Sequence, residues 1–173
     1  MHSSPAVPGS AVSGPPASAA SGPRLYVVVT FVPRRTDVTV GSLGAVAFPR
    51  AWYAYVGGAA RARRARVKRH LAPDKPLRWH ADHLFAAFPP RCAWLVDGAP
   101  GECELAGALA ALPGAERLPR RFGAGDCRCA GHLVRLPRRP RRRDLEVSAQ
   151  AAGAPEHGAV RSFAPARRCA QDV

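Results

Sequence analysis

The segment Trp52-Tyr53-Ala54-Tyr55-Val56-Gly57-Gly58 gives the strongest single indication of how this chain folds. Its aromatic and β-branched residues favour a strand over residues 52–56, and the two glycines permit a tight junction to a helix. Residues 59–71 contain no Gly or Pro and are good helix formers, so we expect a helix that ends before Pro73. A second helix is expected from residue 76 to about residue 88.

Further strands and helices are expected on both sides of this segment. Residues 25–32 are β-branched and aromatic, which is typical of a buried strand. A third helix is expected over residues 102–112, followed by a long loop from 113 to 130. Shorter strands are expected over residues 37–40, 45–48, 91–96 and 131–136. A small sheet with three helices follows, which is an α+β fold of the α/β sandwich type.

The composition changes near both ends of the 173-residue chain. Residues 1–23 are nearly all Ser, Pro, Gly and Ala, with too few large apolar groups to offset the entropy of ordering. We therefore expect residues 1–23 to form a disordered leader. From Pro137 the chain is rich in arginine and then polar, so residues 137–173 are expected to form a basic, disordered tail. Residues 24–136 are the predicted domain.

The chain carries a formal net charge of +14 and has a pI of about 11.2. Clustered Lys and Arg favour polyanions because they displace counterions from a phosphate backbone. A compositional bias toward Arg, Ala, Pro and Gly would raise the charge without any such partner. The arginine run after Pro137 has the same two interpretations, a phosphate-contacting arm or a solvated tail.

No run of apolar residues approaches the roughly 20 that a membrane span needs, so we expect no membrane span. The first residues lack the charged and apolar regions of a secretory signal. The five cysteines are odd in number and indicate no disulfide framework, which fits a reducing compartment. Together these features favour a cytoplasmic location.

Six ordered blocks of the sequence resemble the GIY-YIG nuclease superfamily. They are Leu25-Tyr26-Val27, Phe48-Pro49 with residues 52–57, residues 66–71, residues 79–84, residues 102–106 and residues 122–133. The chain looks like a small branch of that superfamily known as a domain of unknown function, sometimes fused to an endonuclease III-like glycosylase. The resemblance implies a small, mainly antiparallel three-stranded sheet flanked by helices. It also implies DNA as a partner and a DNA-repair glycosylase as a candidate partner.

The resemblance assigns roles to individual positions. In the resembling nucleases two tyrosines lie on neighbouring strands, an arginine lies on the next helix, and a glutamate on a later helix holds a metal ion. The matching positions here are Tyr26, Tyr55, Arg66 and Glu102. A tyrosine is the favoured general base in those nucleases, and we expect this role at Tyr26. The chain departs from the pattern at Gly58, Gly125 and Gly131, which replace expected serines. Fewer hydroxyl groups therefore surround the site.

The same residues suit phosphodiester hydrolysis on chemical grounds. Glu102 can hold Mg²⁺ or Mn²⁺, because a hard divalent cation binds one or two carboxylates and keeps several waters. Arg66 can clamp a phosphate, and Tyr26 or Tyr55 can orient or deprotonate water if a nearby cation lowers the phenol pKa. His70 lies one helical turn from Arg66 and can share that work. The plainer alternative is that the tyrosines pack strand faces, Arg66 lies on a solvated basic face and Glu102 stabilises a helix start.

Five residues are candidates for direct contact with nucleic acid: Arg63, Lys68, Arg69, Trp79 and His80. The cations can contact phosphates, and Trp79 can stack on a base. Asp82 belongs to the same family motif and can form a supporting pair with His80. The alternative is that Trp79 packs in the core and the histidines are solvated.

The segment Asp126-Cys127-Arg128-Cys129 with His132 belongs to the last family block and offers three metal ligands. Cys103 would supply a fourth if the fold brought it close. The Cys-x-Cys spacing departs from the cysteine pairs of common structural zinc sites. Zinc is therefore not expected, and a buried thiol turn is the favoured interpretation.

Two functions are consistent with these residues. The first is a metal-dependent endonuclease that hydrolyses phosphodiester bonds in DNA, in a role related to repair. The alternative is a noncatalytic nucleic-acid-binding module that kept the fold but lost turnover.

Overall fold

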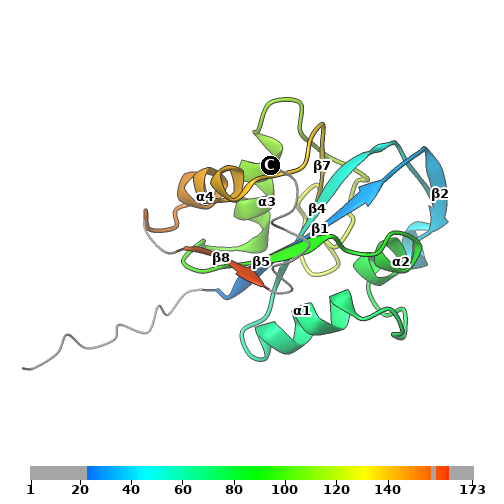
Figure 1. The fold of residues 1–173 in the computed structure, drawn as a ribbon, viewed down its shortest axis with the longest axis horizontal. Coiled ribbons are helices and arrows are strands. Elements are labelled where there is room, and N and C mark those ends of the chain that lie inside the picture. Colours follow the sequence, from blue (N-terminus) through cyan, green and yellow to red (C-terminus); the bar gives the residue numbers. More distant parts are fainter. Residues whose placement is uncertain (1–22, 157–158, 164–173) are drawn as a thin grey trace, which may run out of the picture.

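The computed structural model describes residues 23–156 and 159–163, in which one large sheet lies between two pairs of helices (Figure 1). Six strands form that sheet in the order β6-β7-β4-β1-β5-β8, and every neighbouring pair is antiparallel. They are β1 (Leu25–Val32), β4 (Ala51–Gly58), β5 (Cys92–Val96), β6 (Glu116–Arg117), β7 (Leu133–Leu136) and β8 (Val160–Phe163). Two further strands, β2 (Thr36–Thr39) and β3 (Ala45–Phe48), pair with each other around a 3-10 turn at Gly41–Leu43.

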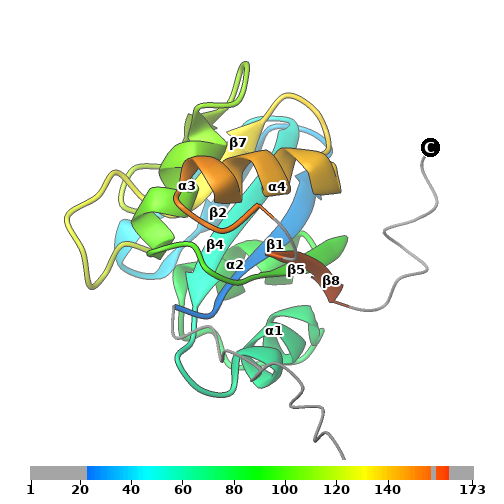
Figure 2. The same cartoon turned by 90° about the vertical axis from the view of Figure 1, so that its left-hand side faces the viewer.

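Four helices flank the sheet. On one side lie α1 (Arg63–Leu71) and α2 (His80–Ala87), and on the other lie α3 (Glu102–Ala110) and α4 (Arg142–Ala151). Figure 2 shows α3 and α4 together on one side of the strands, with α1 on the other. None of the described helices is long and apolar enough to cross a membrane. The predicted α+β class, with a mainly antiparallel sheet flanked by helices, is confirmed.

The central strand β1 explains why its sequence is a continuous apolar run rather than an alternating one. Successive side chains of a strand point to opposite faces, and both faces of β1 are covered by helices. Leu25, Val27 and Val29 pack into the cluster under α3 and α4, which we call the aliphatic face. Tyr26 and Val28 pack into the cluster under α1 and α2, which we call the aromatic face.

The expectation of a three-stranded sheet is wrong, because the sheet has six strands. Two of the additional strands come from segments for which no strand was expected. The short strand β6 lies inside the predicted loop, where it pairs with β7. The strand β8 lies in the predicted tail, where Val160 and Phe163 are buried and pair with β5.

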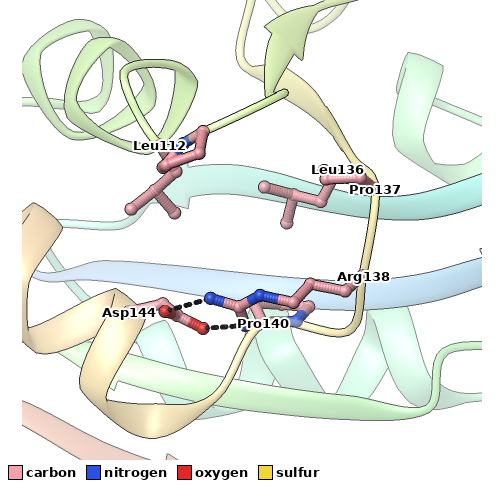
Figure 3. Close-up of a pocket in the computed structure, with 7 residues that line it drawn as sticks. Leu112, Leu136, Pro137, Arg138, Pro140 and Asp144 are labelled. Carbon is pink, nitrogen blue, oxygen red and sulfur yellow. Dashed lines mark hydrogen bonds and ion pairs between the residues drawn. The ribbon is translucent and has the colours of Figure 1, made fainter.

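The expectation of a disordered tail from residue 137 is also wrong for the described residues beyond it. Helix α4 buries Leu145, Ser148 and Ala149, which lie three and four positions apart and therefore on one helical face. Arg138 makes two hydrogen bonds of 2.7 and 2.8 Å with the Asp144 carboxylate at the start of this helix (Figure 3). A small pocket of about 170 Å³ lies beside this ion pair, between Leu112 and Leu136. Residues 1–22 of the predicted leader, and residues 157–158 and 164–173, lie outside the described residues.

The starts of α1 and α2 differ from their predicted bounds for local reasons. Strand β4 continues to Gly58, and Ala62 has a left-handed backbone with φ of 54°, so α1 begins only at Arg63. Helix α2 begins at His80, because the Asp82 carboxylate accepts the backbone N–H groups of Arg78 and Trp79, both at 3.0 Å. Trp79 is the N-cap residue, and Asp82, at the third position of the helix, accepts its backbone N–H as in a capping box.

Candidate functional site

Tyr26 and Tyr55 lie on neighbouring strands and on the same face of the sheet, as the resemblance implies. Tyr26 is opposite Gly57 in the pairing of β1 with β4, and the two phenol rings are 6.5 Å apart. A Cβ atom at Gly57 would lie 2.4 Å from the Tyr26 hydroxyl oxygen. The absence of a side chain at Gly57 is what allows the Tyr26 ring to lie across β4.

The Tyr26 hydroxyl meets His70 from α1. Its oxygen lies 3.0 Å from His70 Nε2, and both side chains are buried. The other ring nitrogen, Nδ1, lies 3.5 Å from Asp82 Oδ1, at an angle that makes no hydrogen bond. Because Nδ1 faces the carboxylate, we place the imidazole proton there, which leaves Nε2 to accept the phenol O–H.

The pKa of His70 is lowered to about 4 by burial, which outweighs the opposite effect of Asp82. His70 is therefore neutral at pH 7, and its Nε2 can accept a hydrogen bond from the phenol. Burial would raise the pKa of Asp82, but hydrogen bonds from Arg69 and from two backbone N–H groups lower it below its usual value. The Arg69 guanidinium contacts both carboxylate oxygens, at 2.8 and 3.0 Å. Tyr26, His70, Asp82 and Arg69 thus form a connected polar chain beneath α1 and α2.

Both phenols are protonated at neutral pH in this structure. Burial raises the pKa of Tyr26 well above its usual value, although Arg66 acts in the opposite direction. Burial also raises the pKa of Tyr55, with the neighbouring Tyr26 and Glu102 adding to the effect. A cation that lowers the phenol pKa was the condition for a tyrosine to deprotonate water, but here desolvation is the larger effect.

Arg66 and Glu102 line an open hollow of about 540 Å³ at the end of β4, together with Leu25 and Gly58. Helix α3 covers the aliphatic face, and Glu102 is its first residue. Its Oε1 would be 2.6 Å from a Cβ at Gly58, so the glycine that replaces the expected serine leaves room for this carboxylate. The charges of Arg66 and Glu102 both act on the Tyr26 phenol. These three side chains therefore lie at one end of the sheet.

The predicted nucleic-acid contacts divide into exposed and internal residues. Lys68 is exposed on α1, and Trp79 is 37% exposed. The guanidinium carbons of Arg66 and Arg69 lie 4.9 and 4.3 Å from the Trp79 ring centre, close enough for cation–π attraction. Trp79 is thus a surface residue held by two arginines rather than a core residue.

Besides Arg69, which is paired with Asp82, two of the predicted contact residues have structural partners. Arg63 is buried and donates to the Leu25 and Val96 carbonyl oxygens and to Asp97 at 2.6 Å. The expectation that Arg63 contacts nucleic acid is therefore replaced by a role in joining β1 to β5. His80 accepts the Gly123 N–H at Nδ1, 3.1 Å away, and its Nε2 lies 3.3 Å from the Ser42 hydroxyl. The expected pair between His80 and Asp82 is not formed.

Four metal-binding side chains come together beside Glu102, and we call them the thiol cluster. Their sulfur and nitrogen atoms all lie within 4.8 Å of one another: Cys103, Cys127, Cys129 and His132. The fold therefore brings Cys103 next to the other three residues, which the sequence alone could not establish. His132 Nδ1 lies 2.9 Å from Glu102 Oε2, a short contact between the imidazole ring and the carboxylate. Asp126, from the same motif, is exposed and lies outside the cluster.

Sequence reasoning missed the residues that hold this cluster in place. Arg121 donates to the carbonyl oxygens of Cys127 and Cys129, and Arg117 donates to that of Cys103 at 2.7 Å. Nothing in the sequence distinguishes these arginines from the many others in the chain.

Comparison with known proteins gives one match. A family described as "Domain of unknown function DUF123" matches residues 25–153, a range that begins with β1 and includes all of α4. No curated protein and no solved structure matches the chain. Because the matched range spans well over half of its length, the chain belongs to the DUF123 family, a domain of unknown function.

Proposed function

We propose that this domain is a metal-dependent endonuclease of the GIY-YIG type that hydrolyses phosphodiester bonds in DNA. One observation carries the proposal: the hydrogen-bonded pair of Tyr26 and His70 lies at the same end of the sheet as the hollow lined by Arg66 and Glu102. General base, phosphate clamp and carboxylate are the groups that such a reaction requires. The GIY-YIG assignment itself, the role in repair and the glycosylase partner rest on the sequence resemblance.

The polar chain gives the protonated phenol a route to act as a base. As water attacks phosphorus, the Tyr26 oxygen takes a proton from the water while its own proton passes to His70 Nε2. The Asp82 carboxylate then faces the imidazolium that forms, which is the arrangement by which an acid supports a histidine in other hydrolases. The bond from phosphorus to the leaving oxygen breaks, and that oxygen takes a proton from solvent. A neutral His70 at pH 7 is what this route needs.

Arg66 is the residue placed to receive the phosphate. It is exposed, lines the hollow and donates to the Gly58 carbonyl at 3.2 Å, a bond that a phosphate oxygen can replace. The positive charge of Arg66 also acts on the buried Tyr26 phenol, where it lowers the pKa against the larger effect of burial.

Glu102 is the residue that would hold Mg²⁺ or Mn²⁺. The fit is reasonable, because its carboxylate is 32% exposed beside an open hollow and these ions accept a single carboxylate together with waters. A bound divalent ion supplies positive charge that stabilises the transition state. The role of this chain is to orient the carboxylate, through the 2.9 Å contact with His132.

The contact between Glu102 and His132 favours the second candidate, a noncatalytic nucleic-acid-binding module. The Glu102 carboxylate is already paired with His132, and both phenols are buried with raised pKa values. Such a module would keep the surface of Arg66, Lys68 and Trp79 and bind DNA without cleaving it.

The first experiment compares two carboxylates in the first turn of α3. The full chain is incubated with labelled duplex and branched DNA in Mg²⁺, Mn²⁺ or a chelator. We expect metal-dependent cleavage that Glu102→Ala reduces by about 10²-fold or more, as for loss of one group that stabilises a transition state. Glu104→Ala, on an exposed residue of the same turn, is the matched control and should cleave normally.

The outcomes separate the two candidates. Binding that weakens steeply with salt, without cleavage under any condition, supports the noncatalytic module. The absence of both cleavage and salt-sensitive binding contradicts both. Arg66→Ala refines a positive result, because a contact made in the transition state reduces turnover far more than binding. Equal losses would reassign Arg66 to general attraction of phosphate.

A further inference from the structure

We infer that the thiol cluster of Cys103, Cys127, Cys129 and His132 is a structural Zn²⁺ site that fastens the start of α3 to the loop before β7. The inference rests on geometry that the spacing in the sequence does not reveal. Cys103 comes from α3, whereas the other three residues come from one loop that ends at Leu133. The four side chains converge with all their ligand atoms within 4.8 Å.

The two sulfur–nitrogen distances match those that a tetrahedral zinc ion imposes on its ligands. Bond lengths of about 2.3 Å to sulfur and about 2.0 Å to nitrogen place ligand atoms about 3.8 Å apart for two sulfurs and about 3.5 Å apart for sulfur and nitrogen. His132 Nε2 lies 3.4 Å from Cys103 Sγ and 3.5 Å from Cys127 Sγ. Cys127 Sγ and Cys129 Sγ are 3.3 Å apart. This sulfur pair would separate slightly to surround an ion, and the other pairs of ligand atoms lie within 4.8 Å of one another.

The ligand types select the metal. Three soft thiolates and one imidazole favour zinc over the hard cations that bind oxygen, and four protein ligands complete a tetrahedron with no place for substrate water. Such a closed site stabilises structure rather than catalysing a reaction. The site therefore differs in chemistry from the single carboxylate of Glu102.

His132 is oriented for this role by its other nitrogen. Its Nδ1 faces the Glu102 carboxylate at 2.9 Å, so the ring proton belongs at Nδ1 and Nε2 is free to bind a metal. Histidine ligands of zinc commonly direct their second nitrogen at a carboxylate, which fixes the ring and its tautomer. The same contact connects the thiol cluster to the candidate catalytic carboxylate.

Backbone hydrogen bonds within the loop fix the positions of its cysteines. Residues 121 and 122 are hydrogen-bonded to residues 130 and 132, through Arg121 N to the Ala130 oxygen at 2.6 Å and His132 N to the Phe122 oxygen at 2.7 Å. Gly131 has φ of 141° and passes so close to Phe122 that a Cβ atom would lie 3.2 Å from the Phe122 nitrogen. Three thiolates with one Zn²⁺ would leave one negative charge beside the guanidiniums of Arg117 and Arg121.

The test measures metal content and needs no DNA, so its result is independent of the proposed nuclease activity. The full chain is purified under reducing conditions without chelator, and zinc is measured by mass spectrometry. We expect about one zinc per chain, retained through desalting. Co²⁺ exchanged into the wild-type chain should show the visible absorption of a tetrahedral ion and the near-ultraviolet band of thiolate coordination.

Variants then identify the ligands. Cys127→Ser and Cys129→Ser should lose the stoichiometric zinc, whereas Cys92→Ala, which changes a described cysteine outside the thiol cluster, should keep it. Glu102→Gln should keep the zinc but bind it about 10-fold to 100-fold more weakly in competition with a chromophoric chelator, because it changes only the support of His132.

Three results would overturn the inference. One is a reduced wild-type chain that holds no zinc after incubation with Zn²⁺ and desalting. Another is a Co²⁺ spectrum without thiolate bands, which is informative even if the serine variants fail to fold. The third is loss of zinc in Cys92→Ala equal to that in Cys127→Ser.

Discussion

The two faces of the central sheet are packed by different kinds of side chain. On the aliphatic face, under α3 and α4, the buried residues include Val27, Leu105 and Leu109. On the aromatic face, under α1 and α2, the buried groups include Tyr26 and His70, which are hydrogen-bonded to each other. Apolar burial stabilises a fold, whereas buried titratable groups cost stability unless they are paired. The difference separates the apolar residues that stabilise the domain from the buried pair of Tyr26 and His70, whereas the candidate metal ligand Glu102 begins α3 on the aliphatic side.

The largest expected effect comes from the aliphatic face. Leu109→Ala removes a fully buried side chain of α3 and should lower the free energy of unfolding by about 2–5 kcal/mol. Chemical denaturation followed by circular dichroism measures this change. The DNA affinity of the folded fraction should stay at the wild-type value. A loss of affinity without loss of stability would show that the two faces are not separate in this way.

The next effect concerns the pH dependence of stability through His70. Its pKa is about 4 in the folded protein, against 6.5 for an ordinary histidine, so the unfolded chain binds more protons between these values. The free energy of unfolding should therefore fall as the pH drops from about 6.5 to about 4, by on the order of 2–3 kcal/mol. His70→Gln should flatten this slope in denaturation curves recorded across that range.

Three other groups also change the pH dependence of stability, so the effect of His70 is taken from the difference between the wild type and His70→Gln. Burial also lowers the pKa of His80, so the wild-type slope includes a contribution in the same direction. Asp82 contributes stability that is lost only as the pH falls below its ordinary value of 3.8. In the zinc-free protein, burial would lower the pKa of His132, but Glu102 raises it overall, and the resulting stabilisation is lost as the pH rises above 6.5. An unchanged slope in His70→Gln would contradict the assignment.

A smaller effect is expected where β4 makes room for the Tyr26 ring. Gly57→Ala places a methyl group 2.4 Å from the phenol oxygen and should displace the ring, at a cost of about 1–3 kcal/mol in unfolding free energy. Gly125→Ala is the matched control, because nothing lies within 4 Å of the added atom. If the proposed function is correct, Gly57→Ala also loses cleavage. Equal behaviour of the two variants would show that the contact with Tyr26 is unimportant.

The smallest effect distinguishes two cations of α1. Lys68→Ala, at an exposed position, should leave stability unchanged and reduce the salt dependence of DNA binding by about 0.9 in log–log slope, as for one lost phosphate contact. Arg63→Ala should lower stability and leave the salt dependence of DNA binding unchanged, because the Arg63 guanidinium is buried against Asp97. Fluorescence anisotropy at several salt concentrations measures the first effect. A reduced slope in Arg63→Ala alone would reverse the two assignments.

The central elements could be predicted because their signals are local. The bounds of β1 follow from its β-branched run, and α3 begins at Glu102 as expected from two acids at a helix start. The tail was mispredicted because its arginines dominate the composition. The spacing of Leu145, Ser148 and Ala149 within α4 was the signal that could have revealed the helix.

The candidate site was only partly predictable. Tyr26, Tyr55, Arg66 and Glu102 were identified through the resemblance, and their separation along the chain gave no direct evidence of proximity. The approach of Cys103 to the cysteines near residue 127 depends on how α3 crosses β7, which no local pattern encodes. The burial of Arg63 could not be predicted from the sequence either, since the neighbouring arginines on α1 are exposed.

The pairing of β8 with β5 has a consequence for truncation. A chain cut after Leu136 would leave the outer hydrogen-bonding groups of β5 open to another molecule, and it would also uncover the residues now beneath α4. Unprotected strand borders recruit further strands, so we expect such a fragment to self-associate. Any shortened form intended for biochemistry should therefore extend at least through Phe163.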